Sequence, residues 1–70
     1  MNEKMYKKYV RLNDRINELT TLNNNIAKLS FYINENQIED ADCANALHGQ
    51  LDFMIKYRDA LQDRIINGYY

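Results

Sequence analysis

The sequence predicts an all-α fold, an antiparallel hairpin of two helices that assembles into a symmetric helical oligomer. Three observations support this prediction. The 70 residues include no proline and only two glycines, so little interrupts a helix before the far end of the chain. Apolar residues recur at steps of three and four in two long runs, which is the spacing that aligns one face of a helix. A short polar segment separates the two runs.

The first apolar run predicts a helix over residues 3–35. Its apolar side chains would form a continuous stripe over about eight turns, at roughly 3.6 residues each. We expect this stripe to pack against the second helix. Its members are Met5, Tyr9, Leu12, Ile16, Leu19, Leu22, Ile26, Leu29 and Ile33.

The polar segment NENQIEDAD, residues 34–42, breaks the helical period and predicts a loop over residues 36–40. Asp40 or Asp42 would cap the next helix, because a short acidic side chain accepts hydrogen bonds from the free N–H groups of a first turn. These acidic groups also face the positive end of the helix macrodipole. A loop this short makes the two helices antiparallel neighbours.

The second apolar run predicts a helix over residues 41–67. Its apolar stripe consists of Ala44, Leu47, Leu51, Met54, Leu61 and Ile65. Gly68 follows the last turn, at the place where glycine commonly ends a helix. Folding the chain near residue 38 pairs positions whose numbers sum to roughly 77, so that Ile26 lies beside Leu51.

The second helix carries more apolar surface than one partner helix can cover. Phe53, Ile55, Tyr57 and Ile66 widen its apolar arc to roughly 200°, about twice the arc that a single neighbour uses. We expect the surplus to be a subunit interface in a homo-oligomer. Arg58 also falls on the seam, opposite Leu19 and within reach of Glu18. A charge in such a position either sets the register of the two helices or belongs to a binding site.

Length and composition exclude several classes of protein. Seventy residues make one small domain, residues 1–70. Cys43 and His48 are the only residues of their types, so we expect no intramolecular disulfide, no metal site and no cofactor. No stretch approaches the roughly 18 apolar residues of a membrane span, and we expect a cytoplasmic protein. No nucleophile, base and oxyanion donor come together, so we do not expect an enzyme.

Positive charge gathers at the start of the chain. Residues 1–15 contain five Lys or Arg and two acids, a local charge of +3, although the net charge of the chain is −1. Lys4, Lys8, Arg11 and Arg15 are spaced four, three and four residues apart, so they form one stripe along the first helix. Positive charge at a helix N-terminus is unfavourable, because the macrodipole there is already positive. A binding role would explain the placement.

Four of the six tyrosines lie near this basic stripe, because the expected register brings residues 68–70 beside Lys8. Cations bind phosphates, and tyrosine rings offer flat faces to a base. This combination suits a nucleotide or an acidic protein surface. The candidate ligand-binding residues are Lys4, Lys8, Tyr9, Arg11, Arg15 and Tyr69. The alternative is that long basic side chains solvate the flank of the seam and tyrosines cover its frayed end.

Two segments resemble a group of short phage-encoded helical-hairpin proteins, which includes small proteins of crAss-like phages. IAKLSFYI, residues 26–33, is similar to the pattern I-x-K-L-x-x-F-I of that group, with Tyr32 in place of the usual Phe. Residues 50–65 are similar to its pattern Q-L-x-x-M-x-x-Y-x-x-x-L-x-x-R-I. Gln50, Tyr57 and Arg64 are the informative matches, because the other positions belong to any hairpin core. Gly49 inside the second helix departs from the pattern.

The group is similar to the hairpin module of phage anti-CBASS and anti-Thoeris proteins, which oligomerise and sequester nucleotide signals of bacterial defence systems. The resemblance implies a counter-defence protein in the cytoplasm of an infected cell. It implies a cyclic nucleotide or a cyclic ADP-ribose-type signal as the ligand. Two alternatives stay open: an inhibitor that binds a host defence or regulatory protein through the acidic loop and the face around Phe53, and an oligomeric phage accessory protein without a ligand.

Overall fold

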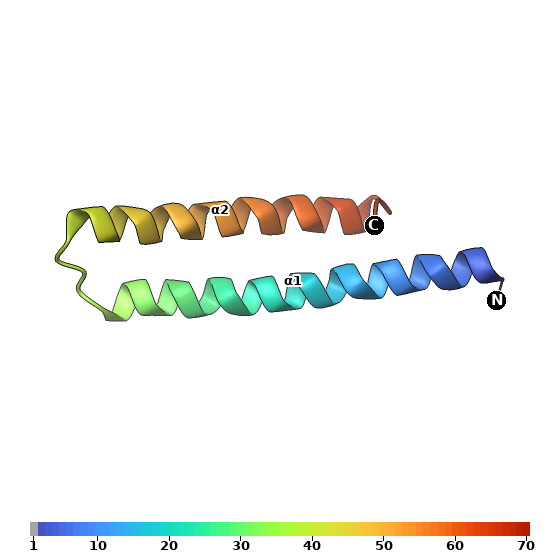
Figure 1. Ribbon diagram of the computed structural model, residues 1–70, viewed down its shortest axis with the longest axis horizontal. Coiled ribbons are helices and arrows are strands. Elements are labelled where there is room, and N and C mark those ends of the chain that lie inside the picture. Colours follow the sequence, from blue (N-terminus) through green and yellow to red (C-terminus); the bar gives the residue numbers. More distant parts are fainter. Residues whose placement is uncertain (1) are drawn as a thin grey trace.

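The computed structural model describes residues 2–70 and consists of two antiparallel helices, α1 (Glu3–Glu35) and α2 (Ala41–Ile66) (Figure 1). No strand occurs among the described residues, which confirms the prediction of an all-α fold. The molecule is a rod of 57 × 16 × 14 Å. The loop closes one end of the rod, and the two termini lie toward the other, open end.

Side-chain caps begin and end α1. Asn2 has extended backbone angles, and its Oδ1 accepts a hydrogen bond of 2.9 Å from the backbone N–H of Met5. At the other end, the side-chain amide of Asn36 donates to the carbonyl of Tyr32 over 2.8 Å. These bonds satisfy groups that a helix terminus leaves without intrahelical partners.

Asp40 caps α2. Its Oδ1 accepts from the backbone N–H groups of Asp42 and Cys43, at 2.9 and 3.1 Å. Asp42 lies in the first turn, where its charge favours the positive end of the helix. Of the two acids that could cap this helix, Asp40 is therefore the cap and Asp42 supplies charge.

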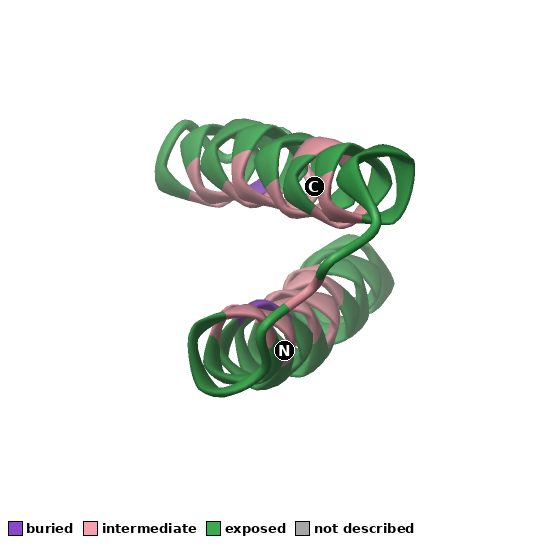
Figure 2. Cartoon of the chain, turned by 90° about the vertical axis from the view of Figure 1, so that its left-hand side faces the viewer, coloured by how far each residue is buried: buried purple, intermediate pink, exposed green. Residues whose placement is uncertain are grey.

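The side chains that form the seam between the helices are spaced three or four residues apart on each helix. They are buried or half-buried (Figure 2). Ile26 is 8% exposed and Leu61 is 1% exposed, and these are the buried apolar side chains of the core among the described residues. On α1 the seam consists of Leu12, Arg15, Leu19, Leu22, Ile26, Leu29 and Ile33. On α2 it consists of Ala44, Leu47, Leu51, Met54, Arg58, Leu61 and Ile65.

Three apolar residues that the periodicity assigned to the seam are exposed instead. Ile16 is 43% exposed, because the seam steps from Leu12 to Arg15 and then to Leu19. Met5 and Tyr9 are exposed because α1 has 33 residues and α2 has 26, so the first turns of α1 extend about 10 Å past the end of α2. The extension leaves one face of α1 open at the end of the rod (Figure 1).

A side-chain hydrogen bond links the two helices. The hydroxyl of Tyr57 donates to Oε1 of Glu18, the only side-chain hydrogen bond between the helices among residues 2–70. The numbers of these two residues sum to 75, close to the sum of roughly 77 that we expect for residues paired across the hairpin. Arg58 contacts its neighbour Asp59, with Nη2 at 3.2 Å from Oδ1, and does not pair with Glu18. The charge that the sequence places on the seam is therefore neutralised on its own helix.

Candidate functional site

A glycine turn at the end of α2 shapes the open end of the rod. Gly68 has a φ of 76°, a conformation that is unfavourable for residues with a Cβ. The N–H of Gly68 donates to the carbonyl of Ile65 over 3.2 Å, and the N–H of Tyr69 donates to that of Arg64 over 2.7 Å. This pair of bonds is the Schellman motif, which ends a helix and reverses the chain direction.

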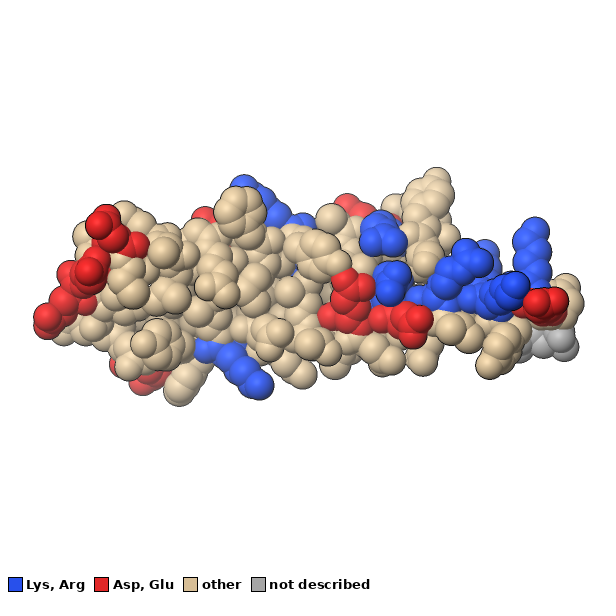
Figure 3. All heavy atoms as spheres, in the orientation of Figure 1, with Lys and Arg blue, Asp and Glu red and all other residues tan. Residues whose placement is uncertain are grey.

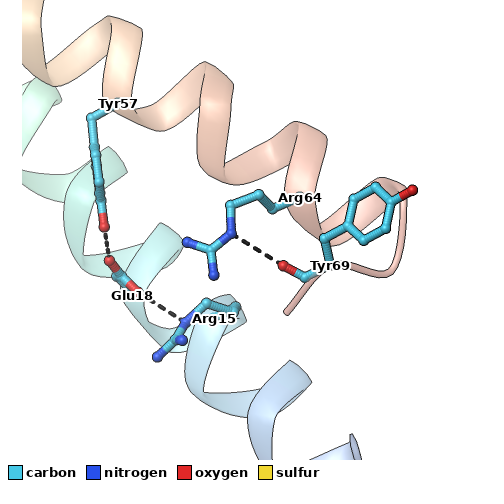
Figure 4. A network of polar contacts seen from close by, with 5 residues as sticks. All are labelled: Arg15, Glu18, Tyr57, Arg64 and Tyr69. Atoms are coloured by element: carbon cyan, nitrogen blue, oxygen red, sulfur yellow. Dashed lines mark hydrogen bonds and ion pairs between the residues drawn. The ribbon is translucent and has the colours of Figure 1, made fainter.

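The side chain of Arg64 holds the reversed chain in place. Its Nε donates to the carbonyl oxygen of Tyr69 over 3.1 Å (Figure 4). The chain then directs Tyr70 toward α1, where Nζ of Lys8 lies over the Tyr70 ring at 6.0 Å from the ring centroid. This distance is at the outer limit of a cation–π interaction. Tyr69 points away from α1 and is 74% exposed.

Two grooves lie side by side beneath Tyr70, where α1 extends past α2. The apolar groove has a volume of about 280 Å³ and is lined by Met5, Lys8, Tyr9, Leu12 and Tyr70. The cationic groove has a volume of about 160 Å³ and is lined by Lys4, Lys8, Arg11, Gly68 and Tyr70. Lys8 and Tyr70 belong to both, so the two grooves adjoin.

Cations dominate the surface at this end of the rod. Figure 3 shows Lys and Arg side chains gathered over the N-terminal half of α1, and acidic side chains over the loop at the opposite end. Lys7 forms an ion pair with Glu3 at 3.2 Å. Within residues 2–70, no carboxylate pairs with Lys4, Lys8 or Arg11. These three cations therefore form no ion pair within this part of the chain.

Arg15, the fourth cation of the stripe, belongs to a polar network on the seam. Its Nε lies 3.0 Å from Oε2 of Glu18, although the N–H is not aligned for a hydrogen bond (Figure 4). Glu18 also accepts from Tyr57, and this hydrogen bond is the main reason that the pKa of Tyr57 is raised above its ordinary value. Desolvation and the charge of Glu18 raise the pKa further, while Arg64 and Arg15 oppose them.

The structure brings four of the six candidate ligand-binding residues together. Lys4, Lys8 and Arg11 line the cationic groove, and Tyr9 lines the apolar groove. Arg15 and Tyr69 line neither groove.

Tyr70 lines both grooves, yet the sequence-based selection did not include it. The signal that could have found it is Gly68. A glycine turn reverses the chain after α2, so the second residue after the glycine, and not the first, returns toward α1.

The described residues offer neither a metal site nor a membrane span. Within residues 2–70, no three His, Cys, Asp or Glu side chains gather in a way that could hold a metal ion. None of the helices in this part of the chain has the length and apolar character required to cross a membrane.

Comparison with known proteins identifies a family. The family model Sequestin matches residues 2–67, nearly the whole chain. No curated protein and no solved structure matches. The match includes both helices and the basic stripe of α1.

Proposed function

The chain belongs to the Sequestin family, and from this membership we propose that it binds and sequesters a nucleotide second messenger of a bacterial immune system. The family name indicates sequestration, which is a binding role rather than a catalytic one. In this proposal the protein is a phage counter-defence protein that acts in the cytoplasm of the infected cell. Its ligand is a cyclic nucleotide or a cyclic ADP-ribose-type signal.

The observation that carries the proposal is the set of cations at the open end of the rod that form no ion pair within residues 2–70. Lys4, Lys8 and Arg11 line one small groove, at a helix N-terminus that is itself positive. A bound phosphate would relieve their mutual repulsion and would also interact favourably with the macrodipole. This accounts for positive charge at a place where it destabilises the free helix.

The groove beside the cations supports a ligand with a ring. Tyr9 lines the apolar groove with Met5 and Leu12, so a flat ring can be covered by an aromatic face and aliphatic side chains. Phosphate and base lie next to each other in a nucleotide, as the cationic and apolar grooves do in this structure. In the proposal Arg15 assists through charge from the seam, whereas Tyr69, which faces solvent and lines neither groove, does not contact the ligand.

We place the ligand in a symmetric oligomer of hairpins. The chain exposes 5590 Å², whereas a compact monomer of 8.4 kDa exposes roughly 4,600 Å². The excess of roughly 1,000 Å² is close to what one partner contributes to a standard protein interface, about 800 Å². Large apolar side chains are available for it, since Phe53 is 74% exposed and Ile66 is 79% exposed. Tyr57 is 48% exposed and lies four residues after Phe53, on the same face of α2.

Calorimetry of two charge variants tests the proposal. The ligands are a panel of cyclic dinucleotides, cyclic trinucleotides and cyclic ADP-ribose isomers. A partly desolvated charged contact contributes about 1.5–3 kcal/mol, so Arg11→Ala should weaken binding by roughly tenfold to a hundredfold. Lys28→Ala is the matched control, because Lys28 is an exposed cation of the same helix outside both grooves. Equal affinities for the two variants would contradict the proposed site.

A second candidate function is supported by the acidic loop and by the exposed face of α2 around Phe53. Phe53 is strongly exposed, and the acids Glu35, Glu39, Asp40 and Asp42 lie at or beside the loop. An acidic surface with an exposed aromatic side chain suits a basic host protein. In this case Phe53→Ser should abolish capture of a stoichiometric host protein from lysate, and Arg11→Ala should leave capture unchanged. The reverse pattern would reject this second function.

A further inference from the structure

The apolar and cationic grooves differ in chemistry but meet at one pair of side chains. Met5, Tyr9 and Leu12 give the apolar groove its surface, and Lys4 and Arg11 give the cationic groove its charge. Lys8 and Tyr70 lie on the boundary, with the Lys8 ammonium over the Tyr70 ring at 6.0 Å from its centroid. A ligand that fills both grooves would place an apolar group next to an anionic one, as the base and phosphate of a nucleotide are placed.

We propose, on the basis of the proposed function, that the adjoining grooves form a subsite for a single nucleotide unit. The base lies between Tyr9 and Tyr70 in the apolar groove. The phosphate lies in the cationic groove. An entering base takes the ring face of Tyr70 that Lys8 covers in the free protein, and the released ammonium then binds the phosphate.

The backbone determines that Tyr70, and not Tyr69, is the second stacking residue. The positive φ of Gly68 reverses the chain, and the bond from Arg64 to the carbonyl of Tyr69 fixes the next residue. As a result Tyr70 is half-buried above α1, whereas Tyr69 faces solvent. Two adjacent tyrosines thus have different roles, and each serves as the control for the other.

The lining of the grooves suits one nucleotide unit per chain. The apolar groove measures about 280 Å³ and the cationic groove about 160 Å³. They provide one apolar surface beside two tyrosine rings and one cluster of three cations, which suits one base and one phosphate. A cyclic dinucleotide, with two bases and two phosphates, therefore requires the grooves of two chains. The site for such a ligand is complete only when a second copy is present.

Calorimetry with ADP as the probe tests the subsite. Tyr70→Ala should weaken ADP binding by roughly fivefold to a hundredfold, the loss expected from one base-stacking ring. Tyr69→Ala should change it by less than about twofold, as expected for an exposed side chain outside the grooves. Both variants keep the carbonyl of residue 69 that accepts from Arg64, so the turn itself is preserved.

Inorganic pyrophosphate is the probe without a base. Its affinity should be reduced in Lys8→Ala, and Tyr70→Ala should weaken pyrophosphate binding less than ADP binding, because pyrophosphate has no base to stack on the ring. ADP should bind with one molecule per chain, and a cyclic dinucleotide with one molecule per two chains. Equal ADP affinities for Tyr70→Ala and Tyr69→Ala would overturn the subsite. Binding of a cyclic ligand without any binding of ADP would also overturn the subsite, but it would leave the proposed function intact. A chain that binds no ligand of either kind would overturn both.

Discussion

Leu61 is the side chain on which the packing of the hairpin depends most. It is 1% exposed and lies in α2 one turn before Arg64, which holds the chain that carries Tyr70. Leu61→Ala removes three carbon atoms, each worth about 0.8 kcal/mol of transfer free energy, and leaves a cavity. Together these effects reduce the free energy of unfolding by about 2–5 kcal/mol. A chain of 70 residues has a total stability of about 3.5–10 kcal/mol, so the loss is a large fraction of it.

Thermal unfolding followed by circular dichroism measures this loss. For a domain of this size, 1 kcal/mol shifts Tm by about 4–8 °C, so a loss near 3 kcal/mol lowers Tm by roughly 10–25 °C. Ile66→Ala is the control, because Ile66 lies on the same helix and is 79% exposed. Its effect should stay within about 0.5 kcal/mol at low chain concentration, where assembly contributes least. Equal effects of the two substitutions would refute the assignment of Leu61 to the core.

Three other predictions follow from the fold. Gly49→Ala should stabilise the chain by about 0.5–1 kcal/mol in chemical denaturation, because the added Cβ meets no atom within 4 Å and alanine favours a helix. Gly68→Ala should destabilise the chain in the same assay, because the φ of 76° at residue 68 is unfavourable for a residue with a Cβ. The pKa of Tyr57 is raised in the folded state by its hydrogen bond to Glu18, so its neutral form is favoured. Its contribution to stability is therefore present below pH 10 and lost as pH rises above 10 through the folded pKa, and Tyr57→Phe should remove this pH dependence of unfolding. Sedimentation at micromolar concentration should show an oligomer, and a well-folded monomer would contradict the proposed assembly.

The sequence was sufficient to predict the two helices and most of the seam. Leu19, Ile26, Leu51 and Leu61 lie where the periodicity placed them, because a run of apolar residues at helical spacing has only one face to bury. Gly68 also ends α2 as glycine commonly does.

The periodicity alone could not decide between Ile16 and Arg15. Both residues are one helical turn from Leu12, and a step of three or of four satisfies the spacing. In the structure Arg15 is half-buried and forms an ion pair with Glu18 on the same helix, whereas Ile16 is exposed. The choice depends on tertiary structure, which a single apolar run does not encode.

The roles of Tyr69 and Tyr70 could not be read from helical spacing either. Both follow the end of α2, where the helical period no longer applies. Their directions depend on the turn at Gly68 and on the bond from Arg64 to the carbonyl of Tyr69. The basic stripe, by contrast, lies within a helix, and its spacing placed Lys4, Lys8 and Arg11 on one groove.

Recovery of the ligand tests the central claim, sequestration, most directly. The protein is mixed in excess with each member of the panel of cyclic dinucleotides, cyclic trinucleotides and cyclic ADP-ribose isomers. The free ligand is then measured by filtration and chromatography, before and after the protein is denatured by heat. Sequestration predicts that one member of the panel disappears from the free pool and returns unchanged in full amount on denaturation. A ligand that stays free throughout, or that returns as a cleaved product, would contradict the claim.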